Sequence, residues 1–369
     1  MSIRRLNLQG WQTPPVSGPA GQLFLAVALA ILTASCASNR PTPLVVQTPA
    51  EAPRAKNPGA YLNLKLVTYN IWGLPSWLTC TRPGRYSQIA HELERLDPDI
   101  ILLQEDWTVK ARKAAPAGGR WSIARGAGQH LFFQQNGLLT LSRFPIIGGA
   151  FYPFSHAAFP DRLVRKGVLK VTLKLADGQV LNVWNVHLQD GGSFEVRQSQ
   201  IAELIARVNE AQDGQIADLV GGDFNCTPES MFVRELETAL GPSVQKLAGI
   251  RPFVTWDGLS SKPGAGQTLD YIFVRSRVPL ESMDAVPQVA FYARNPRERL
   301  SDHFGIESVV SLSPTPVLAS LPASISGSRG FERAVVQRTS FAGPRGDRRT
   351  LTVPQTVRST EAHMATAWP

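Results

Sequence analysis

The sequence predicts an α+β protein built in layers, with one folded domain over residues 64–312. Strand-like and helix-like runs follow one another through this range, and an Asp177-Gly178 hairpin signal separates two of the strand-like runs. Apolar residues make up 43% of the 369-residue chain, enough for a large core. Because hairpins mix with helices that follow strands, we expect layered sheets and helices rather than a purely parallel α/β fold.

The first half of this domain alternates strand and helix patterns. Residues 64–71 (LKLVTYNI) alternate and are rich in β-formers, and residues 100–105 (IILLQE) form a short apolar run that ends in an acid. Both predict strands. Between them, residues 86–96 carry apolar side chains at helical spacing, and residues 137–144 predict a further strand that ends before a proline.

The second half is predicted in the same way. Residues 168–175 and 180–188 flank the Asp-Gly dipeptide and predict a hairpin. Residues 194–211 place apolar side chains on one face of a helix. Further strands are expected at residues 217–222, 269–275, 286–293 and 304–312.

The two ends of the chain differ from this domain. Residues 1–36 start with basic residues, continue into an apolar run and end at Cys36, which predicts a signal peptide of lipoprotein type with Cys36 as the lipidated residue. An ordinary signal peptide cleaved nearby is the alternative. Residues 37–63 are rich in Pro and Ala and predict an extended tether. Residues 313–369 predict a largely disordered basic tail, in which a short piece around residues 331–341 could dock. The expected location is outside the cytoplasm, anchored to a bacterial membrane or secreted.

The net charge of +9 belongs mostly to those ends. Residues 1–63 and residues 313–369 each carry +4, which leaves +1 for residues 64–312. The high pI is therefore not evidence for a basic nucleic-acid-binding face on the folded domain, although a local patch stays compatible with it. In an exported protein Cys80 and Cys226 could pair or remain two thiols.

Polar side chains gather at the ends of the predicted strands. Each alone is explained by turn chemistry, but their number indicates a shared site. The residues are Asn70, Glu105, His187, Asp223, Asn225, Asp270, Asp302 and His303. Carboxylate and amide oxygens suit Mg²⁺, and a histidine held by a buried aspartate is a suitable base. This set favours metal-assisted hydrolysis of a phosphate ester, and no GxSxG, HExxH or Walker motif is present in the sequence.

Seven motifs then occur in the order found in the endonuclease/exonuclease/phosphatase superfamily, which the chain resembles over residues 64–312. They are VTYNIWG, LLQE, GLLTLSRFPI, VHLQ, GGDFN, LDYIFV and LSDHFGI. The resemblance implies a four-layered α/β sandwich, in which two packed mixed sheets are flanked by helices. It also implies hydrolysis of phosphate esters that depends on Mg²⁺, with Mn²⁺ or another divalent cation as the alternative.

The resemblance also implies roles for the strand-end residues. Asn70 and Glu105 resemble the metal-site residues of the superfamily, and Asp302 matches an acidic position near the metal. His187 resembles the histidine that contacts the phosphate or serves as general acid.

The remaining four residues resemble the part of the site that acts on water and phosphate. Asp223 matches the residue that orients or activates the water, and Asn225 matches a partner of a phosphate oxygen. His303 resembles the base, with Asp270 as the carboxylate that orients it. The sequence leaves open which of Asp223 and His303 takes the proton from water.

Within the superfamily, residues 187–204 (HLQDGGSFEVRQSQIAEL) resemble the neutral sphingomyelinases. The segment DRLVRKG, which ends at Gly167, is also similar to theirs and nominates Lys166 and Gly167 as substrate-binding residues. The alternatives are an edge-strand charge and a bulge. Inositol polyphosphate phosphatases and abasic-site nucleases match less well.

Two apolar segments could contact a membrane interface, although core packing is the ordinary fate of such residues. They are Trp72, Leu74, Trp77 and Leu78, and Phe151, Tyr152, Phe154 and Phe159. The sequence therefore favours a monomeric, membrane-associated, sphingomyelinase-like phosphodiesterase that acts on a phospholipid in preference to DNA. An exported DNase I-like endonuclease and a catalytically inactive, tethered binding protein are the alternatives.

Overall fold

The structure is a computed structural model that describes part of the chain. The described residues are 41–48, 62–74, 84–126, 136–191, 193–247, 253–258, 266–287, 299–313, 339–342 and 348–351. The chain divides into two compact units, Met1–Pro316 and Val317–Pro369. The predicted signal segment, Cys36 and Cys80 lie outside the described residues. None of the described helices is both long and apolar enough to cross a bilayer.

The first unit contains a seven-stranded sheet in the order β1-β4-β5-β3-β2-β12-β11. Only β2 and β3 run parallel, and every other neighbouring pair in this sheet is antiparallel. The strands are β1 Leu44–Gln47, β2 Leu62–Asn70, β3 Ile100–Gln104, β4 Ser122–Gly126, β5 Leu139–Ser142, β11 Leu280–Pro287 and β12 Ile306–Leu312.

The second sheet has five strands in the order β10-β9-β8-β7-β6. Only β8 and β9 are parallel here. The strands are β6 Ile146–Pro153, β7 Gly167–Lys174, β8 Val180–His187, β9 Ala217–Asp223 and β10 Asp270–Ser276. Each sheet therefore has one parallel pair, and it is this pair that places polar strand ends side by side.

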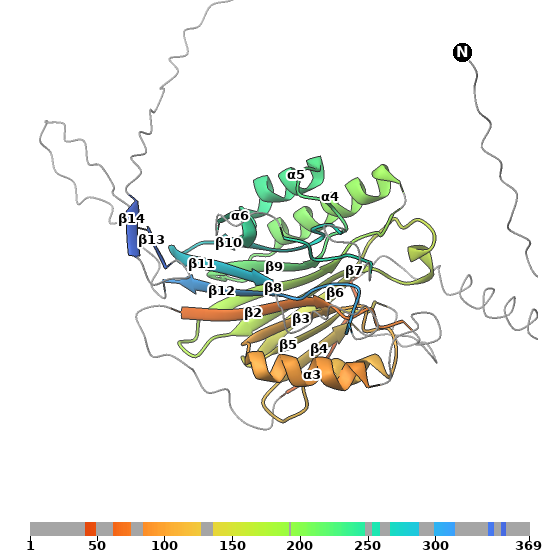
Figure 1. Cartoon of the computed structure of the whole chain (residues 1–369), viewed down its shortest axis with the longest axis horizontal. Helices are drawn as coiled ribbons and strands as arrows, with labels where there is room; N and C mark the ends of the chain where they lie inside the picture. Colours follow the sequence, from red (N-terminus) through yellow and green to blue (C-terminus); the bar gives the residue numbers. More distant parts are fainter. Residues whose placement is uncertain are drawn as a thin grey trace, which may run out of the picture. The chain divides into compact units, whose positions relative to one another are not determined.

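Helices connect the parallel strands and cover the outer faces of the sheets. Helix α3 (Arg85–Leu96) links β2 to β3, and α4 (Phe194–Glu210) links β8 to β9, as parallel neighbours require. Helices α5 (Met231–Leu240) and α6 (Val244–Leu247) precede β10. Figure 1 shows α3 on one side of the two sheets and α4 with α5 on the other. The predicted four-layered sandwich of two mixed sheets flanked by helices is confirmed.

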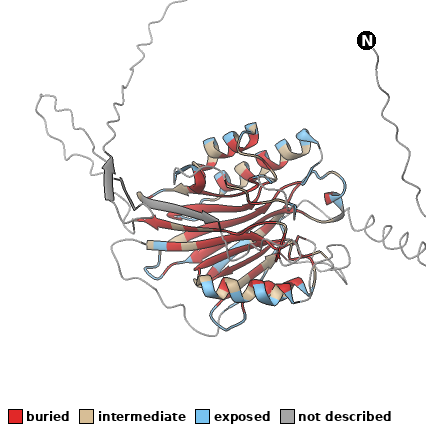
Figure 2. Ribbon diagram, in the orientation of Figure 1, coloured by how far each residue is buried: buried red, intermediate tan, exposed pale blue. Residues whose placement is uncertain are grey.

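Successive side chains of β2 point to opposite faces of the sheet, so this strand contributes to two hydrophobic clusters. Leu64 and Leu66 face the core between the sheets, whereas Val67 and Tyr69 pack in the cluster beneath α3. A third cluster, beneath α4 and α5, covers the outer face of the five-stranded sheet. Figure 2 shows the result, with buried residues along the strands and exposed residues on the outer sides of the helices.

Strand β1 corrects one prediction. The segment was predicted to be part of an extended tether over residues 37–63, but Leu44–Gln47 pairs with β4 at the edge of the seven-stranded sheet. Just before it, Thr42 exchanges two backbone hydrogen bonds with Phe151 of β6, at 2.9 and 3.0 Å. The tether prediction is therefore wrong for this segment, which joins the edges of both sheets. The sequence signal was weak because the run is only four residues long.

Other differences concern edges and tails. Strand β11 lies at Leu280–Pro287, whereas a strand was predicted at residues 286–293, of which 288–293 fall outside the described residues. In the second unit β13 (Thr339–Ala342) pairs with β14 (Arg348–Leu351) as an antiparallel hairpin. The composition of residues 313–369 had indicated a largely disordered tail without this pairing. Short strands with little alternation leave no clear pattern.

One apolar segment proposed for membrane contact is mostly core. Phe151 and Phe154 are buried, Tyr152 is half-buried against Trp184, and only Phe159 is strongly exposed, at 70%. In the other segment Trp72 and Leu74 are half-buried, while Trp77 and Leu78 lie outside the described residues.

Candidate active site

The two parallel strand pairs deliver polar residues to one edge of the sandwich. In the first sheet Asn70 is in register with Gln104, so Glu105 follows immediately beside it. In the second sheet Asp223 is in register with both His187 and Asp270. We call this edge, at which Asn70, Glu105, His187, Asp223 and Asp270 lie, the site edge. The sequence prediction that these strand ends form one site agrees with this register.

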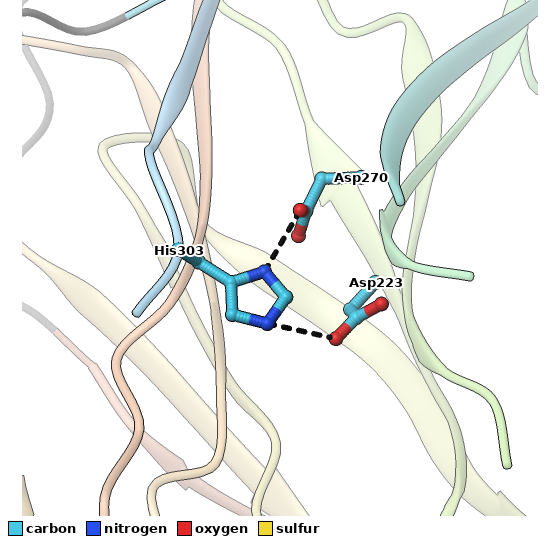
Figure 3. A group of neighbouring side chains, drawn as sticks. All are labelled: Asp223, Asp270 and His303. Carbon is cyan, nitrogen blue, oxygen red and sulfur yellow. Dashed lines mark hydrogen bonds and ion pairs between the residues drawn. The ribbon is translucent and has the colours of Figure 1, made fainter. Parts of the chain in front are cut away.

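His303 lies between two aspartates at the site edge, as Figure 3 shows. Its Nδ1 is 2.9 Å from Oδ2 of Asp270, and its Nε2 is 3.6 Å from Oδ2 of Asp223. Side-chain ligand atoms of the three residues lie within 4.8 Å of one another, and all three residues are buried. His303 belongs to the segment before β12 and the aspartates to the other sheet, so this contact crosses between the sheets.

Asn70 connects the two halves of the site. Its Nδ2 donates to Oε1 of Glu105 at 3.1 Å and to Oδ2 of Asp223 at 3.0 Å, and lies 3.4 Å from Nε2 of His303. Its Oδ1 accepts from the backbone N–H of Trp72, and its backbone oxygen accepts from Ser301 Oγ at 2.7 Å. The Asn70 amide is therefore fixed on both sides.

The acidic side chains crowd one another: Asp223 and Asp270 are buried, and Glu105 and Asp302 are half-buried. Burial, and then the nearby Asp270 carboxylate, raise the pKa of Asp223 to about 7. Burial and the Asp302 carboxylate raise the pKa of Glu105, and burial raises the pKa of Asp302. Carboxylates whose ionised forms are destabilised in this way gain most from a bound cation. The donor set of hard oxygens therefore fits a divalent metal such as Mg²⁺.

The two histidines are in opposite electrostatic settings. Burial would lower the pKa of His303, but the Asp270 and Asp223 carboxylates outweigh it and raise that pKa to about 10. Burial, together with the charges of Lys166 and His303, lowers the pKa of His187 well below its ordinary value. His303 is thus held as a cation and His187 as a neutral ring.

His187 has an unsatisfied ring nitrogen. Its Nδ1 is buried without a hydrogen-bond partner in the described part of the chain, and its Nε2 lies 3.6 Å from Oδ2 of Asp223, beyond a normal hydrogen bond. Leaving a buried imidazole nitrogen unpaired costs about 1–3 kcal/mol.

Asn225 and Lys166 meet at one carbonyl. Asn225 Nδ2 donates to the backbone oxygen of Leu188 at 3.0 Å, and Lys166 Nζ donates to the same oxygen at 3.1 Å. Lys166 is buried and also pairs with Asp161 Oδ2 at 2.7 Å. Sequence reasoning missed Asp161, which has no motif of its own. The Lys166 charge lies close enough to lower the pKa of both Glu105 and Asp223.

Gly167 is explained by packing. A Cβ atom at this position would lie 2.2 Å from the backbone oxygen of Tyr152 and 2.9 Å from the Phe151 ring. The nominated substrate-binding pair therefore consists of a lysine held near the site and a glycine that permits close approach of β6 and β7.

Asp302 lies beside His303 and forms hydrogen bonds with residues that the sequence analysis did not identify. Its Oδ2 accepts from Trp256 Nε1 at 3.2 Å, and its Oδ1 accepts from Ser301 Oγ at 3.3 Å. Buried Arg85 donates to the carbonyls of Ile71, Trp72 and Leu300, which flank the site segments. These supports form only in three dimensions, and neither spacing nor composition predicts them.

The possible bridge between the remaining cysteines is not supported for the described thiol. Cys226 is a free cysteine buried beneath α4 and α5. Burial raises its pKa to about 12, so this thiol is not a nucleophile at neutral pH.

Comparison with known proteins agrees with this architecture. The "Putative neutral sphingomyelinase" of Drosophila melanogaster is 26% identical over 272 residues, which cover 68% of this chain and 61% of the relative. The "Inositol phosphosphingolipids phospholipase C" of Schizosaccharomyces pombe is 25% identical over 301 residues, covering 69% of this chain and 70% of the relative. This chain thus spans less than two thirds of the fly protein.

Solved structures share the fold. The crystal structure of an endonuclease/exonuclease/phosphatase from Bacteroides vulgatus matches with a TM-score of 0.54 at 19% identity, over 68% of this chain and 99% of that one. In sequence, the Endonuclease/Exonuclease/phosphatase family matches residues 67–303, a range that runs from β2 to His303 and includes every residue of the site edge. The chain belongs to the endonuclease/exonuclease/phosphatase family.

Proposed function

We propose that this protein hydrolyses a phosphodiester of a phospholipid, in the manner of a sphingomyelinase, with a divalent cation at the site edge. The single observation that carries the proposal is the position of His303, paired with Asp270 through Nδ1 and facing Asp223 through Nε2. A histidine oriented by one carboxylate and opposed by a second is suited to transfer a proton and to stabilise phosphate charge.

The geometry divides the chemistry among three side chains. Asp223 Oδ2 lies 3.6 Å from Nε2 of both His187 and His303, and because burial raises the pKa of Asp223 its carboxylate is a stronger base than an ordinary one and can take the proton of an attacking water. The cationic His303 then stabilises the negative charge that develops on the phosphate. Neutral His187, whose Nε2 lies 3.6 Å from Asp223 Oδ2, is proposed to hydrogen-bond a phosphate oxygen through that nitrogen.

Glu105 and Asn70, with Asp302 beside them, are the residues that would hold the cation. When bound, a divalent ion supplies charge neutralisation on the phosphate. Asn70 fixes the Glu105 carboxylate through its 3.1 Å hydrogen bond and so limits the ways in which Glu105 can point. Mg²⁺ is proposed first because the side chains offer oxygen ligands.

A lipid substrate is favoured by two observations. Both curated relatives carry names that refer to sphingolipid hydrolysis. In addition, residues 64–312 carry a net charge of only +1, whereas a protein that depends on phosphate contacts along a duplex benefits from a strongly basic face.

We also infer that the protein is exported and attached to a membrane through Cys36. The inference rests on the basic start, the apolar run and the cysteine at its end. In cells supplied with labelled fatty acid, the wild-type chain is expected to incorporate the label and a Cys36→Ser variant to lack it. Equal labelling of the two chains would contradict this attachment.

The substrate is tested by offering purified protein and Mg²⁺ vesicles that contain sphingomyelin, vesicles that contain an inositol phosphosphingolipid, and plasmid DNA. We expect release of the phosphorylated headgroup from at least one lipid, and a loss on the order of a thousand-fold in a His303→Ala variant. Nicking of DNA with both lipids intact would assign the protein to the nuclease branch of the family.

A further inference from the structure

Among the described residues eight large apolar side chains are strongly exposed, and four of them lie on segments that leave the site edge: Val109 (65% exposed), Phe159 (70%), Phe194 (48%) and Met231 (46%). The other four, Val45, Val46, Ile147 and Leu247, lie on β1, near the start of β6 and at the end of α6. Isolated exposed apolar residues are common on protein surfaces, but a group of them on one side of a molecule marks a contact surface. We call Val109, Phe159, Phe194 and Met231 the apolar rim.

The topology places each member of the apolar rim at the site edge. Val109 follows Glu105, and its neighbour Thr108 donates to the backbone oxygen of Gly73, just beyond the end of β2. Phe159 lies in the connection between β6 and β7, whose site-edge ends are paired at Pro153 and Gly167.

The other two members begin the helices that follow the site strands. Phe194 is the first residue of α4, after β8, and Met231 is the first residue of α5, after β9. They are neighbours through Phe232, whose ring centroid lies 4.9 Å from that of Phe194. The connection between β6 and β7, which contains Phe159, is hydrogen-bonded to the segment between β8 and α4, because Ala158 N donates to Gln189 Oε1 at 2.8 Å.

The N-terminal segment enters the domain at the same edge. Leu44, the first residue of β1, is in register with Gly126, the last residue of β4. Its neighbour Arg125 is in register with Leu139 of β5, and Leu139 lies opposite Leu103 near the site end of β3. The start of β1 is therefore at the site edge. Thr42 is bonded to Phe151, two residues before β6 ends at the site edge. The described chain therefore begins, at Pro41 and Thr42, on the side of the apolar rim.

Only five residues separate Cys36 from Thr42. Fully extended, the six residue steps from Cys36 to Thr42 span about 21 Å. With Cys36 as the point of lipid attachment, this length keeps the domain close to the bilayer and leaves little freedom to turn its site edge away. The prediction of a long tether over residues 37–63 would have allowed any orientation.

We propose that the apolar rim is a lipid-contact surface that seats the site edge against the bilayer. The proposal rests on the proposed lipid substrate and deepens it, because it states how a headgroup reaches His187 and His303. The basic residues Lys110 and Arg162 are exposed close in sequence to Val109 and Phe159, where they can meet lipid phosphates. Phe194 and Met231 instead have the exposed acidic neighbours Glu195 and Glu229, so the charge of the surface favours lipid contact only on the side of Val109 and Phe159.

The test uses the chain from Ala37 onward, which keeps every described residue and removes the apolar leader and the anchor. A triple variant, Val109→Ser, Phe159→Ser and Met231→Ser, is compared with wild type for sedimentation with phosphatidylcholine–sphingomyelin vesicles. The matched control is Ile147→Ser, an equally apolar residue that is 54% exposed near the start of β6, at the opposite end of that strand from the site edge.

We expect the triple variant to bind vesicles about ten-fold more weakly or worse, and the control to bind as wild type does. Turnover of a water-soluble ester, bis(p-nitrophenyl) phosphate, is expected to stay within about two-fold in both, since no substituted residue contacts the proposed reacting groups. Vesicle binding that is unchanged in the triple variant, or equally reduced in the control, would overturn the proposal. Loss of vesicle binding in a protein that hydrolyses no lipid would support the rim and refute the proposed substrate.

Discussion

An Asp270→Asn variant is expected to lose activity by about a thousand-fold or more while it remains folded. Asp270 Oδ2 accepts from His303 Nδ1 at 2.9 Å, and this contact both orients the ring and raises the pKa of His303. An asparagine can present its NH₂ group to Nδ1 instead, which favours the wrong tautomer. It also removes the negative charge that keeps the imidazole protonated.

The measurement is kcat for the lipid that the wild-type protein hydrolyses, with circular dichroism and thermal unfolding on the same preparations. The matched control is Asp213→Asn. That aspartate also holds a cation, Lys170, but lies in the turn before β9, at the end of the strand away from Asp223. Activity of Asp270→Asn within ten-fold of wild type would show that His303 does not work through this carboxylate.

A Glu105→Gln variant is expected to abolish the stabilisation of the protein by Mg²⁺ as well as most of its activity. Four carboxylates, those of Glu105, Asp223, Asp270 and Asp302, crowd the site edge, and burial raises the pKa of three of them. A cation that binds only the folded chain stabilises it by about 2.7 kcal/mol at a concentration of one hundred times its Kd. Without the Glu105 charge much of this gain disappears.

Differential scanning calorimetry with and without Mg²⁺ checks this expectation independently of turnover. Wild type is expected to gain several degrees in Tm, and Glu105→Gln about none. Glu307→Gln is the control, because Glu307 pairs with Lys65 on the sheet surface and lies away from the cluster. Chelation is expected to remove the Mg²⁺ shift from wild type and to leave the Tm of the variant unchanged. A full Mg²⁺ shift in Glu105→Gln would place the cation on other ligands.

The sequence predicted those parts of the fold that strong local patterns encode. Alternation in residues 64–71, the helical spacing of residues 86–96 and the Asp177-Gly178 turn all correspond to observed elements. The misses have physical reasons. Strand β6 contains Gly148 and Gly149, which weaken a strand signal, and β1 is stabilised by its neighbours β4 and β6 rather than by its own propensity.

The candidate site was predictable as a set of residues but not as a set of contacts. Motif order identified Asn70, Glu105 and His303, because the end of a strand pattern can be recognised in the sequence alone. The Asn70 hydrogen bonds to carboxylates on both sheets, 35 and 153 positions away in the chain, depend on how the sheets pack. The ion pair between Lys166 and Asp161 likewise cannot be predicted from the spacing of the two residues in the sequence.

The close approach of the two sheets has a mechanical consequence. Gly221 of β9 faces Leu102 of β3 so closely that an added Cβ would lie 2.8 Å from a Leu102 methyl group. At the site edge, Asn70 of β2 reaches Asp223 of β9, and His303, which precedes β12, reaches Asp270 of β10. The proposed reacting groups therefore come from two different sheets, and their distances depend on the spacing between the sheets. Warming that increases the distance between the sheets is therefore expected to lower the proposed activity before either sheet loses its own hydrogen bonds.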